Sequence, residues 1–403
     1  VVAVIDSGLR VTHEDLAGNL WENASDSLNG LDDDGNGIVD DLHGFDAITM
    51  TGALRDESGH GSHVGGIIGA VGDNGLGVAG IAWKTQLMGI RFLDSNRLGT
   101  VSDSIASIEY AVSKEADILN LSWGTDRYSA SLELALTEAS DAGLLIVAAA
   151  GNDGNQLSGR PTYPASYRIK NQVVVASSNN LGRLSDFSNY DVDLVHLAAP
   201  QGSMSCIAES DAGYENWHGT SMSAGYVSGA LALLKERFPE EGSGWLLNRL
   251  FDSVRLSKGF ASKVSTGGVL DLHRAVTGES NVPINDAFSD ATELPGFGGR
   301  ESGTVALASL EEGESLPVEE SGGTTVWYRW LALESGTVNL EFSPLGFEGV
   351  VAIYRGDAVS NLQPVDRLLS NPSTLSTTAF FAAEKGATYY FQVDRRSEFG
   401  GRF

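Results

Sequence analysis

The sequence predicts an α/β protein with a parallel sheet flanked by helices, followed by a small all-β sandwich domain. Up to residue 276, apolar runs that suit buried strands alternate with segments of helical periodicity, which is typical of a parallel sheet covered on both faces. From residue 283 onward the helical periods stop, and short alternating runs are separated by turns rich in Gly, Ser and Asp. With 403 residues, 42% of them hydrophobic, the chain is long enough for two cores.

The first part is expected to contain strands and helices in alternation. The strand candidates are runs of Val, Ile and Leu without polar alternation, which suits strands that are buried on both faces. In chain order they cover residues 1–5, 85–92, 117–121, 144–149, 173–176 and 194–198. Between them, apolar residues recur at helical spacing in residues 60–70, 101–115, 129–142 and 221–238.

The second part is expected to be all β. Its strand candidates alternate apolar and polar residues over short stretches, at 325–330, 337–342, 350–354, 379–382 and 388–393. We therefore expect one domain at 1–276, a linker at 277–282 and a second domain at 283–403. Because the chain begins at Val1 without an initiator Met and stops soon after its last strand, we expect it to lack both terminal parts of a longer protein.

The composition argues against several classes of partner. Lys and Arg total 26 against 53 Asp and Glu, a formal net charge of -27, which disfavours binding to nucleic acids and to anionic membranes. No stretch reaches the ~18 apolar residues of a membrane span. Cys206 is the only cysteine, which excludes an internal disulfide and a metal site built from several thiolates.

Three short segments carry residue types that act together in nucleophilic catalysis. The run VIDSGL places Asp6 at the carboxyl end of a buried strand, where active sites form in open α/β sheets. The run GHGSHVGG places His60 at the start of a helix, and the run HGTSMSA places Ser221 at the N-terminus of another. A Ser hydroxyl needs a base to take its proton as it attacks, so the three residue types suit one reaction.

In this chain order, Asp6, His60 and Ser221 resemble the catalytic triad of the subtilisin-like serine proteases, the subtilases of peptidase family S8. The resemblance covers nearly all of residues 1–276 and implies a serine endopeptidase that hydrolyses peptide bonds in proteins. It implies that His60 is the general base and that Asp6 orients it. It also implies that Asn152, in the run AAAGNDG, donates to the oxyanion together with the backbone N–H of Ser221.

The same resemblance implies where an extended peptide substrate binds as an added β-strand. The groove walls would be Leu98, Gly99 and Thr100 on one side and Ser122, Trp123 and Gly124 on the other. The cleft for the side chain before the scissile bond would be lined by Ala149, Ala150 and Gly151, with Ser166 near its floor. Such a cleft is apolar and roomy, so we expect broad specificity with an apolar preference at that position.

Two features need a separate interpretation. Gly225 and Tyr226 stand where the family has Pro and His after the nucleophile. Because a Gly inside a helix costs ~1 kcal/mol relative to Ala, we expect a less rigid nucleophile helix, without loss of a catalytic group. His63 lies three positions after His60, and we expect it to be structural.

Calcium is the expected cofactor, in a structural role, and no organic cofactor is expected. The acidic run at 29–41 spaces its oxygen ligands as in an EF-hand loop, with His43 where the bidentate Glu would stand; the alternative is a solvated acidic turn. The ligands expected there are Asp32, Asp34, Asn36, the Ile38 carbonyl and Asp40. The family resemblance implies a second site with Asp15, Asp73, Asn74 and the carbonyls of Leu76 and Val78.

The second part resembles the bacterial pre-peptidase C-terminal domain, a β-sandwich often appended to secreted proteases, through runs such as NDAF, TVWYRW and AIYRG. The resemblances together imply a secreted, monomeric protease that acts on proteins and peptides and is made with an N-terminal propeptide outside this chain. On alternating strands Trp327 is expected in the core and not on a binding face. Two alternatives remain: a catalytically silent binding or adhesion protein, and an exopeptidase on the same fold.

Overall fold

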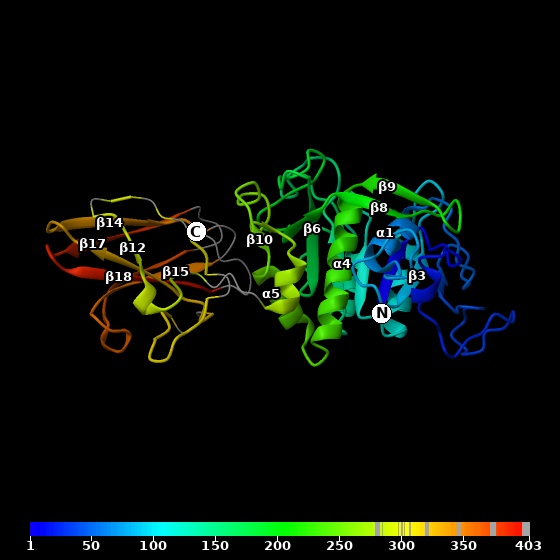
Figure 1. The fold of residues 1–403 in the computed structure, drawn as a ribbon, viewed down its shortest axis with the longest axis horizontal. Coiled ribbons are helices and arrows are strands. Elements are labelled where there is room, and N and C mark those ends of the chain that lie inside the picture. The colour runs from blue at the N-terminus through cyan, green and yellow to red at the C-terminus, as the bar shows by residue number, and fades with distance from the viewer. Residues whose placement is uncertain are drawn as a thin grey trace. The chain divides into compact units, whose positions relative to one another are not determined.

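The computed structural model describes residues 1–278, 283, 285–296, 298–299, 301, 303–305, 308–318, 322–344, 348–370 and 376–396. The chain divides into two compact units (Figure 1). The first unit contains residues 1–250, 254–264 and 268–277, and the second contains 251–253, 265–267 and 278–403. Most of the expected linker, residues 279–282, lies outside the described residues.

The first unit is built on a nine-stranded sheet with the order β10-β11-β7-β6-β5-β4-β1-β3-β2. Neighbouring strands are parallel except for β10 and β11, which are antiparallel. The bounds are β1 Val2–Asp6, β2 Gly44–Asp46, β3 Leu87–Arg91, β4 Ile118–Leu121, β5 Leu145–Ala149, β6 Gln172–Ser178, β7 Leu197–Pro200, β10 Arg255–Leu256 and β11 Gly268–Val269. Parallel strands end at one edge, so the loops after β1, β4 and β5 meet there.

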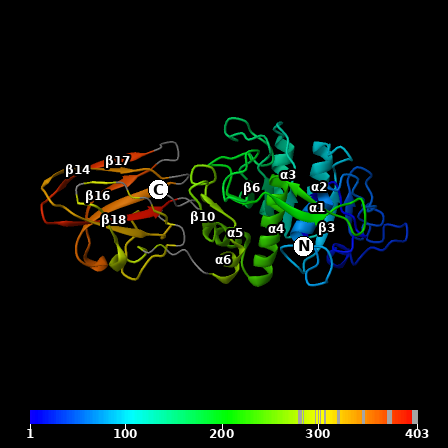
Figure 2. The same cartoon turned by 45° about the horizontal axis from the view of Figure 1, so that its top comes forward.

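Helices cover both faces of this sheet (Figure 2). The helices α1 (His60–Gly69) and α4 (Thr220–Arg237) pack together on one face, and α2 (Val101–Ser113) packs with α3 (Ala130–Asp141) on the other. The remaining helical elements are η1 Ala17–Asn19, α5 Ser243–Asp252 and α6 Leu272–Thr277. Among the described residues, no helix combines the length and apolarity that crossing a bilayer requires.

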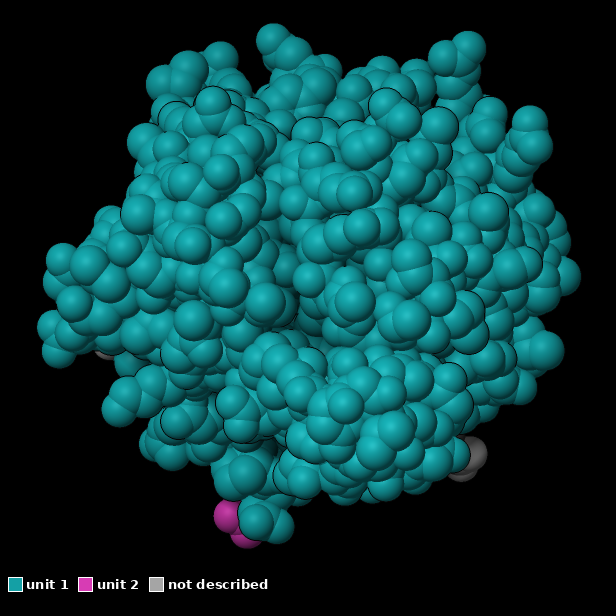
Figure 3. Space-filling view, turned by 90° about the vertical axis from the view of Figure 1, so that its right-hand side faces the viewer, with its two compact units in different colours: residues 1–250, 254–264, 268–277 teal, residues 251–253, 265–267, 278–403 magenta. Residues whose placement is uncertain are grey.

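The strands of the sheet are apolar because both of their faces are covered. Ile5, Ile90, Leu119 and Ile146, from four adjacent strands, are fully buried in one core cluster. Truncating such a side chain to Ala typically costs ~2–5 kcal/mol of stability. This packed sheet is the rigid platform from which the loops at its edge project, and Figure 3 shows the surface of the unit that contains it.

Gly225 has a packing reason in α4. A Cβ at this position would stand 3.3 Å from Cγ2 of Ile67 in α1, and one at Gly229 would stand 2.6 Å from Cβ of Ile81. The helix runs without interruption from Thr220 to Arg237. The glycines therefore allow α4 to approach α1 and the following loop closely.

A hairpin of β8 (Gly202–Cys206) and β9 (Tyr214–His218) leads into α4. The sequence did not predict this hairpin, because its strands are mostly polar and lack the apolar runs of the sheet. Very short β2, β10 and β11 were missed for a related reason: two or three residues carry no detectable period. The six longer strands and the four long helices lie within a few residues of the expected ranges.

The second unit is built from mainly antiparallel sheets. A five-stranded sheet has the order β12-β13-β18-β15-β16, and β14 pairs with β17. The bounds are η2 Phe288–Asp290, β12 Thr292–Glu293, β13 Val326–Leu331, β14 Gly336–Phe342, β15 Gly349–Arg355, η3 Val359–Asn361, β16 Gln363–Leu369, β17 Thr377–Ala383 and β18 Thr388–Arg395. The sheets share one core, and Trp327 is fully buried as expected, while the neighbouring Tyr328 is only 6% exposed.

Candidate active site

Asp6 ends β1 and His60 begins α1, and their side chains are in contact. The Oδ1 atom of Asp6 lies 2.7 Å from Nδ1 of His60, and both residues are buried. Asp6 Oδ1 also accepts the N–H of Ser7, whereas Asp6 Oδ2 is buried without a hydrogen-bond partner among the described residues. This carboxylate holds the proton of a neutral imidazole on Nδ1 and leaves Nε2 free to act as a base.

Asp56 and Ser7 fix the start of α1. Asp56 Oδ1 accepts the hydroxyl of Ser7 at 2.8 Å, and its Oδ2 accepts the N–H of Ser62 at 2.8 Å. The Ser7 hydroxyl oxygen accepts the N–H of Gly61 at 2.9 Å. Burial raises the pKa of Asp56, although the hydrogen bonds from Ser62 and Ser7 oppose the rise. These contacts tie the end of β1 to the first turn of α1 and so determine where His60 lies.

Ser221 is the second residue of α4 and is only 8% exposed. Its Oγ donates to the carbonyl of Ser122, 2.9 Å away, and Ser122 Oγ donates to the carbonyl of Ser221 at 2.9 Å. In this structure the Ser221 hydroxyl is therefore hydrogen-bonded to the end of β4 and not to His60. Catalytic hydrogen bonds often tighten only when substrate binds, and rotation between staggered rotamers redirects a Ser hydroxyl.

Asn152 lies in the loop after β5, and Thr220 orients its side chain. Asn152 Oδ1 accepts the backbone N–H of Thr220 at 2.9 Å and the Thr220 hydroxyl at 3.0 Å. Thr220 thus occupies Oδ1 of the amide, and the N–H groups of Nδ2 remain to donate to another group. A Cβ on Gly219 would stand 3.6 Å from Nδ2, so this donor lies beside the N-terminus of α4. An N–H donor fixed at such a place can stabilise a developing oxyanion.

The loop that carries Asn152 is shaped by the buried side chain of Asn189. Asn189 Oδ1 accepts two N–H groups of this loop at 3.1 and 2.9 Å, and its Nδ2 donates to the carbonyl of Ala150 at 3.0 Å. Gly151 has a φ of +104°, and a Cβ there would stand 2.4 Å from Asn189 Nδ2. Only Gly fits this position without displacing Asn189.

Phe92 lies between the two expected walls of the substrate groove. Its ring meets the ring of Trp123 edge-on with 4.8 Å between centroids, and a Cβ on Gly99 would stand 2.6 Å from Phe92 Cδ2. Trp123 is half-buried against the core, Leu98 is exposed, and Thr100 caps α2 by accepting an N–H of its first turn at 3.1 Å. Both walls therefore pack on one side chain, which keeps their separation fixed.

The expected cleft next to these walls is bordered by small residues. A Cβ built on Gly124 or Gly151 would stand 2.7 or 3.5 Å from Cγ2 of Thr162, so both glycines lie beside this side chain. The hydroxyl oxygen of Ser166 accepts the N–H of Thr162 at 3.1 Å. The residues that precede Gly151 at the end of β5 are buried: Ala149 and Ala150. The structure thus brings Gly124, Gly151 and Ser166 together around Thr162.

His63 has structural contacts, as expected. Its Nε2 lies 3.0 Å from the carbonyl of Glu215 and is the donor, and its Nδ1 is buried without a partner among the described residues. The indole of Trp217 stacks on it with 4.9 Å between centroids. Burial lowers the pKa of His63 to about 4, although the Glu215 hydrogen bond opposes the shift. Trp217 also faces His60, with 6.5 Å between ring centroids.

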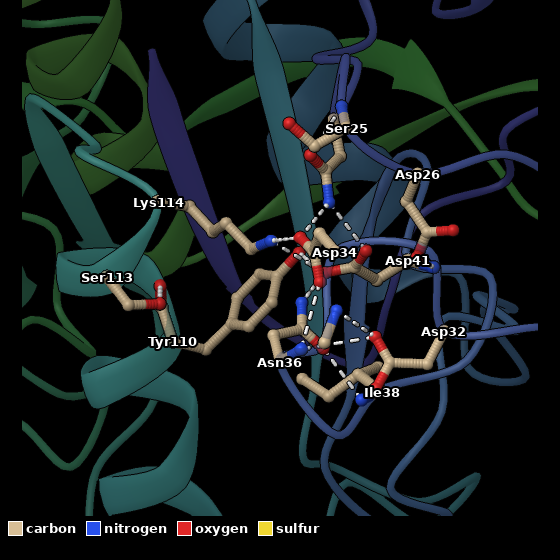
Figure 4. A network of polar contacts seen from close by, with 12 residues as sticks. Ser25, Asp26, Asp32, Asp34, Asn36, Ile38, Asp41, Tyr110, Ser113 and Lys114 are labelled. Atoms are coloured by element: carbon tan, nitrogen blue, oxygen red, sulfur yellow. Dashed lines mark hydrogen bonds and ion pairs between the residues drawn. The ribbon is translucent and has the colours of Figure 1, made fainter.

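Asp26, Asp34 and Asp41 form a separate group of three carboxylates away from these residues, which we call the acidic cluster. One oxygen of each lies within 4.8 Å of the others (Figure 4). Lys114 Nζ lies 2.6 Å from Asp34 Oδ2 and 3.2 Å from Asp41 Oδ2, and the Tyr110 hydroxyl donates to Asp41 Oδ2 at 2.8 Å. Burial acts to raise the pKa of Asp34, but hydrogen bonds, above all from Lys114, lower it to about 2. Converging carboxylate oxygens fit a hard cation such as Ca²⁺.

Of the five ligands expected from EF-hand spacing, only one contributes a carboxylate to the acidic cluster. Asp34 belongs to the acidic cluster, and Asn36 donates to Asp41 Oδ2 at 2.8 Å. Asp32 instead accepts backbone N–H groups inside the loop, for example that of Gly35 at 2.8 Å. Two further expected ligands also contact the loop itself: Asp40 accepts the N–H of Asn29 at 2.9 Å, and Ile38 donates its N–H to Asn36 Oδ1 at 2.7 Å.

The second expected calcium loop surrounds the buried carboxylate of Asp15. Its Oδ1 accepts Asn74 Nδ2–H at 2.7 Å, and its Oδ2 accepts the N–H of Val78 at 2.8 Å and the Tyr214 hydroxyl at 2.9 Å. The structure thus brings Asp15, Asn74 and Val78 together. The other two expected ligands are exposed: Asp73 and Leu76.

Several residues at these sites were not predicted from the sequence. The signal for Asp56 was an acidic residue shortly before the start of α1, and the signal for Thr220 was a hydroxyl at the first position of α4. No sequence signal singles out Asn189, because its role depends on contacts with a loop far away in the chain. Asp26 and Asp41 lie outside the regular ligand spacing on which the calcium prediction relied.

Comparison with known proteins agrees with this geometry. The subtilase family of peptidases S8 matches residues 1–250. Subtilisin-like protease 1 of Plasmodium berghei (strain Anka) is 32% identical over 294 residues, which are 68% of this chain and 49% of that protein. The minor extracellular protease Epr of Bacillus subtilis (strain 168) is 35% identical over 241 residues, which are 60% of this chain and 32% of that protein.

A solved structure supports the same assignment. The crystal structure of a cold-adapted subtilisin-like serine proteinase superposes with a TM-score of 0.53 at 26% identity, covering 65% of this chain and 86% of that one. The chain spans no more than about half the length of the curated relatives given above. The matched region includes the whole candidate site, from Asp6 to Ser221. The chain therefore belongs to the subtilase family of serine proteases.

Proposed function

We propose that this chain is a serine endopeptidase that hydrolyses peptide bonds within proteins. The observation that carries the proposal is the contact between Asp6 Oδ1 and His60 Nδ1. It lies at the sheet edge where β4 and β5 also end. A buried carboxylate that orients an imidazole is what a Ser nucleophile requires as its base. Ser221 is the nucleophile, at the N-terminus of α4.

The reaction begins when the Ser221 hydroxyl turns from the Ser122 carbonyl toward His60 Nε2. His60 takes the proton as Ser221 Oγ attacks the substrate carbonyl, and it later gives that proton to the leaving amine. Asp6 accepts the Nδ1–H hydrogen bond throughout the reaction and stabilises the imidazolium. Because Asp6 Oδ2 has no hydrogen-bond partner among the described residues, the charge of this carboxylate is available to stabilise His60. Water then repeats the sequence on the acyl-enzyme, which releases the acid product.

The oxyanion of each tetrahedral intermediate is bound by donors that are already in position. We assign this role to Asn152 Nδ2 and to the backbone N–H of Ser221. Thr220 supports the assignment because its two hydrogen bonds to Asn152 Oδ1 leave the amide N–H groups turned outward. A donor fixed before the reaction needs no reorganisation in the transition state, and such a donor typically contributes ~10²–10³ in turnover.

The substrate would lie between residues 98–100 and residues 122–124. We propose an apolar preference before the scissile bond, because the residues expected to border the cleft, Ala149, Ala150 and Gly151, carry no charged or polar side chain. Trp123 packs edge-on against Phe92, so its bulk is directed partly into the core. Beyond this position the specificity is broad, since backbone contacts of an added strand do not depend on side chains.

We propose Ca²⁺ as a structural cofactor. The residues that would hold it are Asp26, Asp34 and Asp41 of the acidic cluster and, in a second loop, Asp15 and Asn74. Bound calcium would neutralise the converging carboxylates and stabilise the folded loops, in a protein that has no disulfide. Calcium takes no part in the chemistry at Ser221.

Further proposals concern where the protein acts, the type of its second unit, its propeptide and its oligomeric state. We propose that it acts outside the cell, since Epr of B. subtilis is named an extracellular protease. We propose that the second unit is a domain of the pre-peptidase C-terminal type, supported by its mainly antiparallel sheets around one core. We also propose that the protein is made with an N-terminal propeptide outside this chain. The mature enzyme is proposed to be a monomer.

Hydrolysis of casein and of an apolar peptide anilide tests this function, with wild type and Ser221→Ala compared in calcium. Activity in wild type that Ser221→Ala lacks supports the serine mechanism. Internal casein fragments indicate an endopeptidase, whereas release of terminal residues alone indicates an exopeptidase. A folded wild type without activity on either substrate points to a catalytically silent binding protein and contradicts the proposal.

A further inference from the structure

Arg97 lies in the turn that leads into the groove wall at residues 98–100. Asp94 closes this turn: its Oδ1 accepts the N–H groups of Asn96 and Leu98 at 2.8 and 2.9 Å, and its carbonyl accepts the N–H of Arg97 at 2.9 Å. Arg97 has a φ of +61°, which is uncommon for a residue with a side chain. The turn therefore presents the Arg97 side chain from a defined backbone position.

The guanidinium of Arg97 lies over the indole of Trp217, with 5.3 Å between Cζ and the ring centroid. The other neighbours of this indole are the histidines of α1: His63 stacks on it at 4.9 Å, and His60 faces it at 6.5 Å with 27° between the rings. Trp217 comes from β9, four residues before Ser221. Arg97 thus reaches from the groove wall to the aromatic side chain beside the catalytic base.

Arg97 is exposed and makes no ion pair with any residue that the structure describes. This is notable in a chain of net charge -27, in which Arg10 pairs with Asp211 and Arg91 pairs with Asp46. A guanidinium offers five N–H donors in a planar fork that matches a carboxylate. Those donors are available to a ligand in the groove.

The direction of substrate side chains connects Arg97 to one substrate position. In an extended peptide, successive side chains point to opposite faces. If the side chain before the scissile bond enters the cleft at Gly151, the side chain one residue upstream points to the opposite face of the peptide. Residues 98–100 would pair with this upstream part of the peptide, and Arg97 adjoins them.

We propose that Arg97 is a specificity-determining residue that binds a carboxylate side chain, Asp or Glu, two residues before the scissile bond. This inference rests on the proposed endopeptidase function and deepens it. The carboxylate would form a paired hydrogen bond with the guanidinium.

Quenched fluorogenic peptides that differ only at this position, with Glu, Gln or Lys, test the proposal on the full chain in calcium. Glu and Gln have the same shape, so their ratio of kcat/KM isolates the charge. For an exposed ion pair we expect wild type to favour Glu over Gln about two- to fivefold. The ratio should fall toward one as the salt concentration rises from 0.05 to 1 M, because exposed charges are screened.

Three variants complete the design. Arg97→Met keeps the apolar stem over Trp217 and should lose the Glu preference, and Arg97→Glu should favour Lys over Gln. Arg237→Met is the matched control, because it removes an exposed Arg at the opposite end of α4 from Ser221. It should keep the wild-type ratio.

The outcomes separate this inference from the function on which it rests. A wild type that cleaves the Gln peptide but shows no Glu preference overturns the inference alone. The same conclusion follows if Arg97→Met keeps the Glu preference, or if the acidic preference lies after the scissile bond. A folded wild type that cleaves none of the peptides overturns the proposed function and this inference together.

Discussion

The side chains of Asp6 and His60 meet at 2.7 Å although 54 positions separate them in the sequence. The contact exists because β1 delivers Asp6 to the carboxyl edge of the sheet and α1 begins with His60 directly above that edge. Ser7 and Asp56 lock the two elements together through hydrogen bonds to the first turn of α1. The orientation of the His60 side chain is thus a property of the packed framework and does not require a substrate.

Replacing Asp6 by Asn tests this orientation. An Asn side chain has nearly the same shape, but its amide can donate to Nδ1 and favour the wrong tautomer of His60, so we expect kcat to fall about 10⁴-fold at neutral pH. Asp141→Asn, an exposed change at the end of α3, should leave kcat unchanged. Casein and peptide assays measure both, and an Asp6→Asn enzyme with near wild-type kcat would contradict the assigned role.

The Asn152–Thr220 pair makes a second prediction. Asn152→Leu removes the amide donor and should lower kcat ~10²–10³-fold with little change in KM. Thr220→Val removes one of the two hydrogen bonds to Asn152 Oδ1 and should lower kcat about tenfold. Because both act through the same donor, the double variant should be no slower than Asn152→Leu. Fully additive losses would show that Thr220 acts independently of Asn152.

His63 predicts a loss of stability in mild acid. Its pKa is about 4 in the folded protein and about 6.5 when unfolded, so the unfolded chain binds more protons between these values. Stability should therefore fall as the pH drops from 6.5 toward 4, by at most about 3 kcal/mol. Thermal midpoints in a Ser221→Ala background measure this, and His63→Gln should flatten the dependence. If the exposed-site control His218→Gln flattens it equally, His63 is not the cause.

Lys114 and calcium are predicted to stabilise the same loop. Lys114→Met leaves Asp34 and Asp41 without the nearby ammonium, so without calcium its thermal midpoint should drop by several degrees. Calcium at 100 times its Kd contributes about 2.7 kcal/mol, and it should narrow the gap between variant and wild type. The test is a calcium titration monitored by thermal unfolding. A wild type whose midpoint does not respond to calcium or to EDTA would exclude a structural calcium site.

The sheet and the main helices could be predicted from the sequence because buried strands and long helices impose periods over many residues. The β8–β9 hairpin could not, since its strands lack an apolar run and β8 owes its position to contacts with α1. Motifs indicated Asp6, His60, Ser221 and Asn152. The supporting contacts of Asp56 and Asn189, like the pairing of Asp26 with Asp41, join distant segments and leave no local pattern. The same holds for Arg97 and Trp217, whose relationship exists only in the folded chain.

The most direct test of the central claim is covalent labelling of the nucleophile. The folded chain in calcium is treated with a fluorophosphonate, which reacts with an activated Ser, and its intact mass and peptide map are measured. The account predicts one adduct per chain, on Ser221, and a rate of labelling that falls sharply in His60→Ala. Labelling elsewhere, or no labelling of a folded wild type, would contradict a Ser221 nucleophile activated by His60 and Asp6.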